Sequence, residues 1–209
     1  CANLTEISIP DSVNAIGPFI FNNCKSLINV KLSSKITRIE QKAFSGCNKL
    51  LNVNIPEGVT YIDSNSFSGC VSLKSIDIPG SVGRIGFLAF NGCSSLESVI
   101  LPEGLTTIEG YLFSDCHSLT AVTIPESITV IEDRAFLYCR SLKDVHIPEN
   151  VIEIQENVFG GCNSLTNLSV SENNSVYKMV DNCLIDIEAK TLIAGFINSA
   201  VPADGSVTE

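Results

Sequence analysis

Apolar residues recur along this chain at fixed places in a period of 23 residues. With the cysteine of each period as position 1, leucine stands at position 4 and aliphatic residues stand at positions 7 and 9, as in Leu73, Ile76 and Ile78. Alternation of apolar and polar residues predicts a short strand with one buried face. Proline at position 10, such as Pro79, is expected to end this strand, because proline has no amide hydrogen to donate to a sheet.

A second apolar pattern follows in each period. Positions 13 and 16 are aliphatic, as in Val82 and Ile85, and a pair such as Ala89-Phe90 follows at positions 20 and 21. We expect an extended or tightly turned segment that returns across the other face, then a turn whose phenylalanine ring fills the core. Glycine before the cysteine, as in Gly92, is expected at a left-handed corner. Tyr138 holds that place once, and there we expect a local distortion or a different backbone path.

The repeated cysteines define the coils. Each lies 23 residues after the one before, and together they are Cys1, Cys24, Cys47, Cys70, Cys93, Cys116, Cys139 and Cys162. A fixed period of 20 to 29 residues with leucine and a cysteine position is typical of a leucine-rich-repeat solenoid. We therefore expect a β-rich, right-handed superhelix of about eight coils, with a stacked parallel sheet on the concave face. Short extended, turn or 3-10 segments are expected on the convex face.

The pattern changes after residue 170. Residues 183–187 and 191–194 are apolar stretches around a short polar loop, which predicts a β-hairpin. The predicted domains are a repeat array, an irregular repeat with an inserted hairpin and the start of a further, truncated repeat, over residues 1–170, 171–199 and 200–209. The chain begins within the pattern, and neither end reads as the polar cap that a solenoid needs, so we expect a segment of a longer protein.

The repeated cysteines have three possible states: buried thiols, disulfides or metal ligands. Stacked coils lie about 4.8 Å apart, but side chains in register point the same way, so the torsion of a disulfide is hard to reach. No pair with the spacing Cys-x-x-Cys supports a zinc site. Reduced, buried thiols are therefore favoured over disulfides and over metal.

The net charge is −10, from 13 Lys and Arg against 23 Asp and Glu. This acidity argues against a nucleic-acid partner and against binding to anionic membranes. The acidic excess lies mostly in residues 101–209, which indicates either a solvated surface or a field that attracts cations or a partner. No apolar run approaches the roughly 18 to 20 residues of a membrane span, and no signal peptide is present in this segment.

The consensus C-x-S-L-x-x-V-x-I-P-x-x-V-x-x-I-G-x-x-A-F-x-G, seen best in residues 70–92 and 116–138, resembles the BspA-like, treponemal class of bacterial leucine-rich repeats. The resemblance covers residues 1–170, and VYKMVDNCLID and KTLIAGF resemble the irregular, hairpin-bearing repeats of such proteins. It implies a surface-exposed or secreted bacterial protein without enzymatic activity that attaches to host matrix proteins or to other microbes. It supplies no catalytic residues and no ligand motif.

The candidate binding surface is the row of strand positions 6 and 8, because the concave sheet face is where solenoids usually bind. Its candidate residues are Asp77, Ile100, Thr123, Asp144 and His146. The row is polar, Ile100 is its one large aliphatic residue, and it has none of the aromatic residues that dominate interaction hot spots. Plain solvated strand surface is the alternative.

Few residues in the sequence are candidates for catalysis or for binding a metal. His117 and His146 lie on different parts of the coil, with no serine or cysteine nucleophile placed to use them, so no enzyme and no catalytic residues are expected. One row of carboxylates stands at position 11, formed by Glu103, Glu126, Glu149 and Glu172. It suggests solvated side chains or a divalent cation, but no calcium-type loop is present, so we expect no metal site and no cofactor.

We therefore expect a monomeric scaffold at the cell surface or in the medium that mediates adhesion through a protein partner, and no insertion into the membrane. The alternative is a structural spacer that holds other domains of a longer surface protein.

Overall fold

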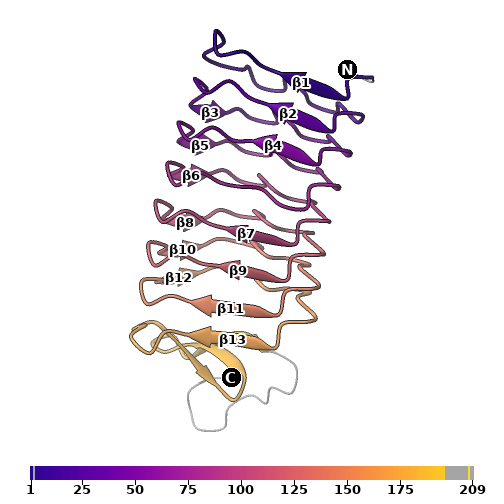
Figure 1. Ribbon diagram of the computed structural model, residues 1–209. Coiled ribbons are helices and arrows are strands. Elements are labelled where there is room, and N and C mark those ends of the chain that lie inside the picture. The colour runs from indigo at the N-terminus through magenta and orange to yellow at the C-terminus, as the bar shows by residue number, and fades with distance from the viewer. Residues whose placement is uncertain (2, 196–206, 208–209) are drawn as a thin grey trace.

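Each 23-residue period forms one coil of a β-solenoid, and the coils stack into an elongated column (Figure 1). The computed structural model describes residues 1, 3–195 and 207. These residues form about seven turns of strands and tight turns, without a helix among them. The leucine-rich-repeat solenoid expected from the sequence is confirmed, although the described convex segments contain short strands and turns and no 3-10 helix.

One row of parallel strands, here called the front sheet, runs along the column. Its strands are β1 (Glu6–Ser8), β2 (Asn29–Lys31), β4 (Asn52–Asn54), β7 (Ser98–Ile100), β9 (Ala121–Thr123), β11 (Asp144–Ile147) and β13 (Asn167–Val170). Paired residues are one period apart, as Ile100 and Thr123 are. Val99 is buried while Ile100 is 76% exposed, so alternate side chains enter the core.

The return segments form a second row, here called the rear sheet. Its strands have two residues each: β3 (Arg38–Ile39), β5 (Tyr61–Ile62), β6 (Arg84–Ile85), β8 (Thr107–Ile108), β10 (Val130–Ile131) and β12 (Glu153–Ile154). The isoleucine of each pair points into the core, and the first residue lies on the surface or half-buried.

Both rows are interrupted in the middle of the column. Residues 75–77 form no strand, so the front sheet is divided between β4 and β7, and the rear sheet is divided between β6 and β8. The coils stay stacked there because hydrogen bonds at the corner of the coil continue through the break, as from the Phe90 amide to the Leu112 carbonyl at 3.1 Å.

The corner that follows the rear sheet is a series of turns joined from coil to coil. Amides at positions 19, 21 and 23 donate to carbonyls of the next coil, for example Gly92 to Ser114 at 2.8 Å. The expectation of a different path at Tyr138 is wrong: its φ is 59°, and its amide donates to the Gly160 carbonyl at 2.7 Å, as glycine does in other coils. These inter-coil hydrogen bonds hold the tyrosine in a left-handed conformation that its side chain disfavours.

Position 19 is also left-handed in every coil, which the sequence analysis did not predict. The residues are Phe19, Lys42, Asn65, Leu88, Tyr111, Arg134 and Asn157, with φ between 53° and 60°. In most coils a turn runs from position 17 to position 20, as from the Gly86 carbonyl to the Ala89 amide at 3.1 Å. Position 19 is the third residue of that turn, where a type II turn requires positive φ.

The core is built from stacked copies of the same side chains. Consecutive rings of Phe21, Phe44, Phe67, Phe90, Phe113, Phe136 and Phe159 lie 5.3 to 5.8 Å apart between centroids and are nearly parallel. None of the nine cysteines is in a disulfide. Seven of them, Cys24 to Cys162, are buried in the same core as these rings, Cys183 is buried in the sheet that follows the last coil, and Cys1 is exposed. The stack converts the small apolar face of one coil into a continuous core.

An antiparallel sheet follows the last coil, formed by β14 (Tyr177–Val180), β15 (Cys183–Asp186) and β16 (Thr191–Gly195). Tyr177 and Leu184 are buried in the core of the array, and the Tyr177 hydroxyl accepts a hydrogen bond from the Ile154 amide at 2.8 Å. These strands therefore cover the core of the last coil. Residues 196–199 of the predicted irregular repeat lie outside the described residues, as does the predicted truncated repeat at 200–209 except Val207.

Candidate functional site

The five candidate binding residues from the sequence lie exposed along the front of the column: Asp77, Ile100, Thr123, Asp144 and His146. Four of them belong to three adjacent front strands, β7, β9 and β11, and Asp77 lies in the coil before β7. The spacing of one period therefore brings residues far apart in sequence into one row.

Asp77 and Ile100 line the same shallow groove. It has a volume of about 250 Å³, and Ser75, Ser98 and the buried Ile76 contribute to its lining. It lies where the front sheet is interrupted, since residues 75–77 form no strand. Within the described chain, the Asp77 carboxylate has no hydrogen-bond or ion-pair partner. The interruption thus places a solvated carboxylate beside the most exposed large apolar side chain among the described residues.

Thr123 extends this surface, whereas Asp144 and His146 contact side chains of β13. Thr123 is the register partner of Ile100 on the next strand. The Asp144 carboxylate accepts a hydrogen bond from the Asn167 amide group at 2.6 Å, and His146 Nδ1 lies 2.9 Å from Ser169 Oγ. The structure therefore groups Asp77, Ile100 and Thr123, and it ties the other two candidates to β13.

The front sheet near the N-terminus is occupied by a ladder of amide side chains. Asn29 donates to the Glu6 carboxylate at 2.8 Å, and Asn52 donates to the Asn29 side-chain oxygen at 3.0 Å. A groove of about 380 Å³ lies over β1 and β2. Because these polar groups bond to one another along the column, they have less to offer a partner than the groove at Asp77 has.

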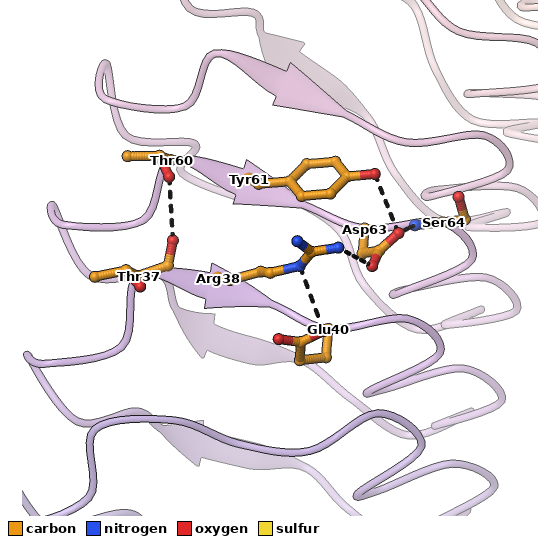
Figure 2. A network of polar contacts seen from close by, with 7 residues as sticks. All are labelled: Thr37, Arg38, Glu40, Thr60, Tyr61, Asp63 and Ser64. Atoms are coloured by element: carbon orange, nitrogen blue, oxygen red, sulfur yellow. Dashed lines mark hydrogen bonds and ion pairs between the residues drawn. The ribbon is translucent and has the colours of Figure 1, made fainter.

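The rear sheet carries a more elaborate polar network (Figure 2). The Arg38 guanidinium donates to Asp63 at 2.6 Å and contacts Glu40 at 3.3 Å, and its carbon lies 4.3 Å from the centre of the Tyr61 ring. Arg84 approaches the same ring at 5.5 Å and is paired with Glu109 at 3.0 Å. One tyrosine is thus held between two arginines from neighbouring coils.

Asp63 is the acceptor at the centre of this network. Burial favours its neutral form, but hydrogen bonds from Arg38, the Ser64 amide and the Tyr61 hydroxyl outweigh burial and lower the pKa of this carboxyl. Burial, and then the charge of Asp63, raise the pKa of Tyr61. Each charge has a partner within the network, and the arrangement joins residues of four consecutive coils.

The buried thiols and the two histidines have the following surroundings. Burial raises the pKa of Cys93 to about 12, which keeps this thiol protonated, and protonated thiols are poor nucleophiles. His117 contacts Asp115 at 3.6 Å, and His146 contacts Ser169. In the described part of the chain, no group of three or more His, Cys, Asp or Glu side chains is placed to hold a metal ion. No described helix has the length and apolar character that crossing a membrane requires.

The sequence analysis missed an exposed aromatic edge at the corner of the coils. The Phe87 and Tyr111 rings meet edge to face at 5.7 Å, and Arg134 lies 5.6 Å from the Tyr111 ring. Gly110 leaves room for this contact, because a β-carbon there would come within 3.2 Å of the Phe87 ring. The sequence does contain a signal for this edge: large residues such as Tyr111 stand at position 19, within the expected turn, where a side chain points outward.

The stacked 23-residue coils define the chain as a leucine-rich-repeat solenoid. Six copies of the BspA type leucine rich repeat region match residues 1–93 and 61–186. The chain belongs to the BspA-type leucine-rich-repeat family, which is a scaffold for protein interaction at the level of the family. A comparison with curated protein sequences finds no match.

Several solved bacterial structures are similar to most of this chain. A leucine rich cell surface protein of Faecalibacterium prausnitzii is 34% identical with a TM-score of 0.82, over 91% of this chain and 54% of that one. The T. pallidum leucine rich repeat protein is 31% identical with a TM-score of 0.73, over 78% of this chain and 79% of that one. A Bacteroides ovatus leucine-rich repeat protein is 33% identical with a TM-score of 0.71, over 81% and 50%. This chain spans about half the length of the first and third of these proteins.

Proposed function

We propose that this chain is a non-enzymatic part of a cell-surface or secreted bacterial protein, and that its front sheet binds a protein of the host matrix or of another microbe. The observation that carries the proposal is the groove at the interruption of the front sheet, where Asp77 and Ile100 are exposed side by side. The proposed location of the protein at the cell surface is supported by the similar F. prausnitzii protein, which is described as a cell surface protein.

The groove offers the chemistry of a small protein contact. Ile100 supplies exposed apolar area, whose burial is worth about 25 cal/mol per Å². Asp77 supplies a carboxylate for a basic or amide group of the partner, and Thr123 adds a hydroxyl on the next strand. The floor is formed by core residues such as Ile76 and Val99, so it is rigid and needs little ordering when a partner binds.

A second candidate function is a structural spacer. The observation that favours it is the ladder of Asn29, Asn52 and Glu6, whose side chains bond to one another along the column. A spacer uses such bonds for cohesion between coils and needs no exposed binding group. The two functions differ in what substitutions on the front sheet do.

The test is a pull-down of the purified chain on immobilised extracellular-matrix proteins and mucins. The front variant carries Asp77→Ala, Ile100→Ala and Thr123→Ala. Its matched control carries Glu149→Ala, Ile152→Ala and Thr106→Ala, which also remove one carboxylate, one isoleucine and one threonine, from exposed places outside the front strands. We expect saturable binding that the front variant weakens at least about tenfold, the size of a loss of about 1.4 kcal/mol, and that the control variant retains.

Equal binding by the two variants would contradict a role for the front sheet. Absence of binding across the panel would favour the spacer.

A further inference from the structure

A second groove lies on the rear side of the column, near the C-terminal end of the described array. It has a volume of about 750 Å³ and is lined by β12 and the residues that follow it, by Asp133 from the preceding coil and by the start of β16. It is the largest of the grooves described here and is separate from the front groove at Asp77.

One wall of this groove is formed by the start of β16, residues Thr191 to Ile193. β16 is the outer strand of the sheet ordered β14-β15-β16, and within the described residues no strand pairs with its other side. On the opposite wall, the Ile154 amide of β12 already donates to the Tyr177 hydroxyl at 2.8 Å. The available main-chain donors and acceptors are therefore those of β16, and an open edge of this kind can accept an extended segment as a further strand.

The other wall is acidic. Asp133, Glu153 and Glu156 line the groove, and none of its lining residues is a lysine or arginine. Glu153 accepts a hydrogen bond from Gln155 at 2.7 Å, and Asp133 is approached by Arg134 at 3.8 Å. Three carboxylates along one wall complement cationic side chains.

Between the walls the groove is apolar. Leu192 is 37% exposed, Ile193 is half-buried beside it, and Ile154 lies beneath. Side chains of an extended strand alternate between two faces, so the apolar residues of a bound segment can face Leu192 and Ile193 while the residues between them face the carboxylates.

We propose that this groove binds an extended protein segment that alternates basic and apolar residues. The segment adds a strand to the open edge of β16 and sets its lysine or arginine side chains against Glu153 and Glu156. This site is independent of the front sheet, so the chain has two binding surfaces on opposite sides.

The test uses the whole chain and a fluorescein-labelled hexapeptide, Lys-Val-Lys-Val-Lys-Val, with binding followed by fluorescence anisotropy. We expect saturable binding that weakens as salt is raised, and no binding of the Glu-Val counterpart. The variant Glu153→Gln with Glu156→Gln should bind the lysine peptide about tenfold more weakly. Its control, Glu126→Gln with Glu149→Gln, makes the same charge change at exposed carboxylates outside the groove and should bind as the unaltered chain does.

Strand addition has its own signature. An edge strand uses alternate amides for pairing, so a peptide N-methylated on its valines and one N-methylated on its lysines should differ, with only one losing binding. Equal affinity of both methylated peptides would overturn the strand-addition geometry. Equal affinity of the two charge variants for the lysine peptide would overturn the assignment of the acidic wall. Loss of peptide binding in the front variant at Asp77, Ile100 and Thr123 would show that the peptide binds the front sheet and would overturn the proposal.

Discussion

The thiol of Cys93 donates a hydrogen bond to the main-chain carbonyl of Phe67, with 3.2 Å between sulfur and oxygen. The same carbonyl oxygen also accepts a hydrogen bond from the Cys70 amide at 3.1 Å, so the thiol occupies the second lone pair of this oxygen. The contact recurs in six coils, from Cys47, Cys70, Cys93, Cys116, Cys139 and Cys162 to phenylalanine carbonyls 26 residues earlier. The cysteines therefore repeat because each coil needs a small apolar side chain with a weak donor at this place.

These contacts predict which thiols react. Burial raises the pKa of Cys47, Cys93 and Cys162 to about 12, so the thiolate that reacts is rare in the folded chain. We expect an excess of a thiol reagent to modify Cys1, the exposed cysteine, and to leave the eight buried cysteines unmodified until urea unfolds the chain. Mass spectrometry counts the labels, and rapid native labelling at Cys93 would contradict the buried, donating thiol.

The phenylalanine stack predicts a large effect at its centre. Phe90 is buried, with its ring 5.4 Å from Phe67 and 5.7 Å from Phe113. Phe90→Ala should lower the free energy of unfolding by about 3–5 kcal/mol and broaden the urea transition, because coils on either side lose their coupling. Phe87→Ala removes a ring that is 42% exposed and should cost about 1 kcal/mol or less. A similar loss in the free energy of unfolding for the two variants would argue against the ring stack as the main stabiliser of the array.

Two glycines without crowded surroundings isolate the cost of a left-handed backbone. Gly92 has a φ of 70°, and a β-carbon there would make only ordinary contacts, at 3.7 Å from Gly69. Gly92→Ala should therefore cost about 1 kcal/mol through its left-handed backbone alone. Gly80 has no atom within 4 Å of a built β-carbon and no positive φ, so Gly80→Ala should be neutral or stabilise by up to about 1 kcal/mol. Urea unfolding of both variants measures the difference, and a shift in the same direction for both would contradict it.

The rear network predicts a dependence on pH. Asp63→Asn removes the ionised acceptor of Arg38 and should cost about 1 kcal/mol at neutral pH, a figure reduced by the partial exposure of the pair. The folded-state pKa of Asp63 is lowered, so its stabilisation is present above the unfolded value of about 3.9 and is lost as the pH falls through the folded value. The unaltered chain should therefore lose its advantage over the variant as the pH is lowered from about 7 to below about 3.9.

Urea midpoints across this range test the expectation. Glu103→Gln is the control, since Glu103 is exposed and stands apart from the network. An advantage that persists undiminished at low pH would assign the stabilisation to shape and not to charge.

The sequence analysis reached the front strands, the rear segment and the phenylalanine turn because each depends on a local pattern that recurs in every coil. It did not reach the left-handed backbone at Leu88, Tyr111 and Arg134, because none of these residue types signals positive φ. The amides at those positions donate to the next coil, as Leu88 does to Gly110 at 3.2 Å, so the neighbouring coil and not the residue decides the conformation.

The candidate binding residues were also predictable from the sequence only in part. Strand alternation sufficed to place Asp77, Ile100 and Thr123 outward, since side chains on a strand alternate between core and solvent. The groove between Asp77 and Ile100 was not predictable, because it depends on strand pairing that fails between two coils of nearly identical pattern. The acidic groove beside β16 joins residues about 40 positions apart in the chain, and no repeat signal connects them.

The sequence by itself determined the period, the coil and the composition of the core, because one coil repeated with a fixed length has only one way to bury its apolar face against a copy of itself. The tertiary structure alone decided where the strand rows break, which turn residues are left-handed and which side chains share a groove. These features arise from contacts between coils, where hydrogen bonds and close packing between residues 23 or more apart outweigh the local preference of each residue.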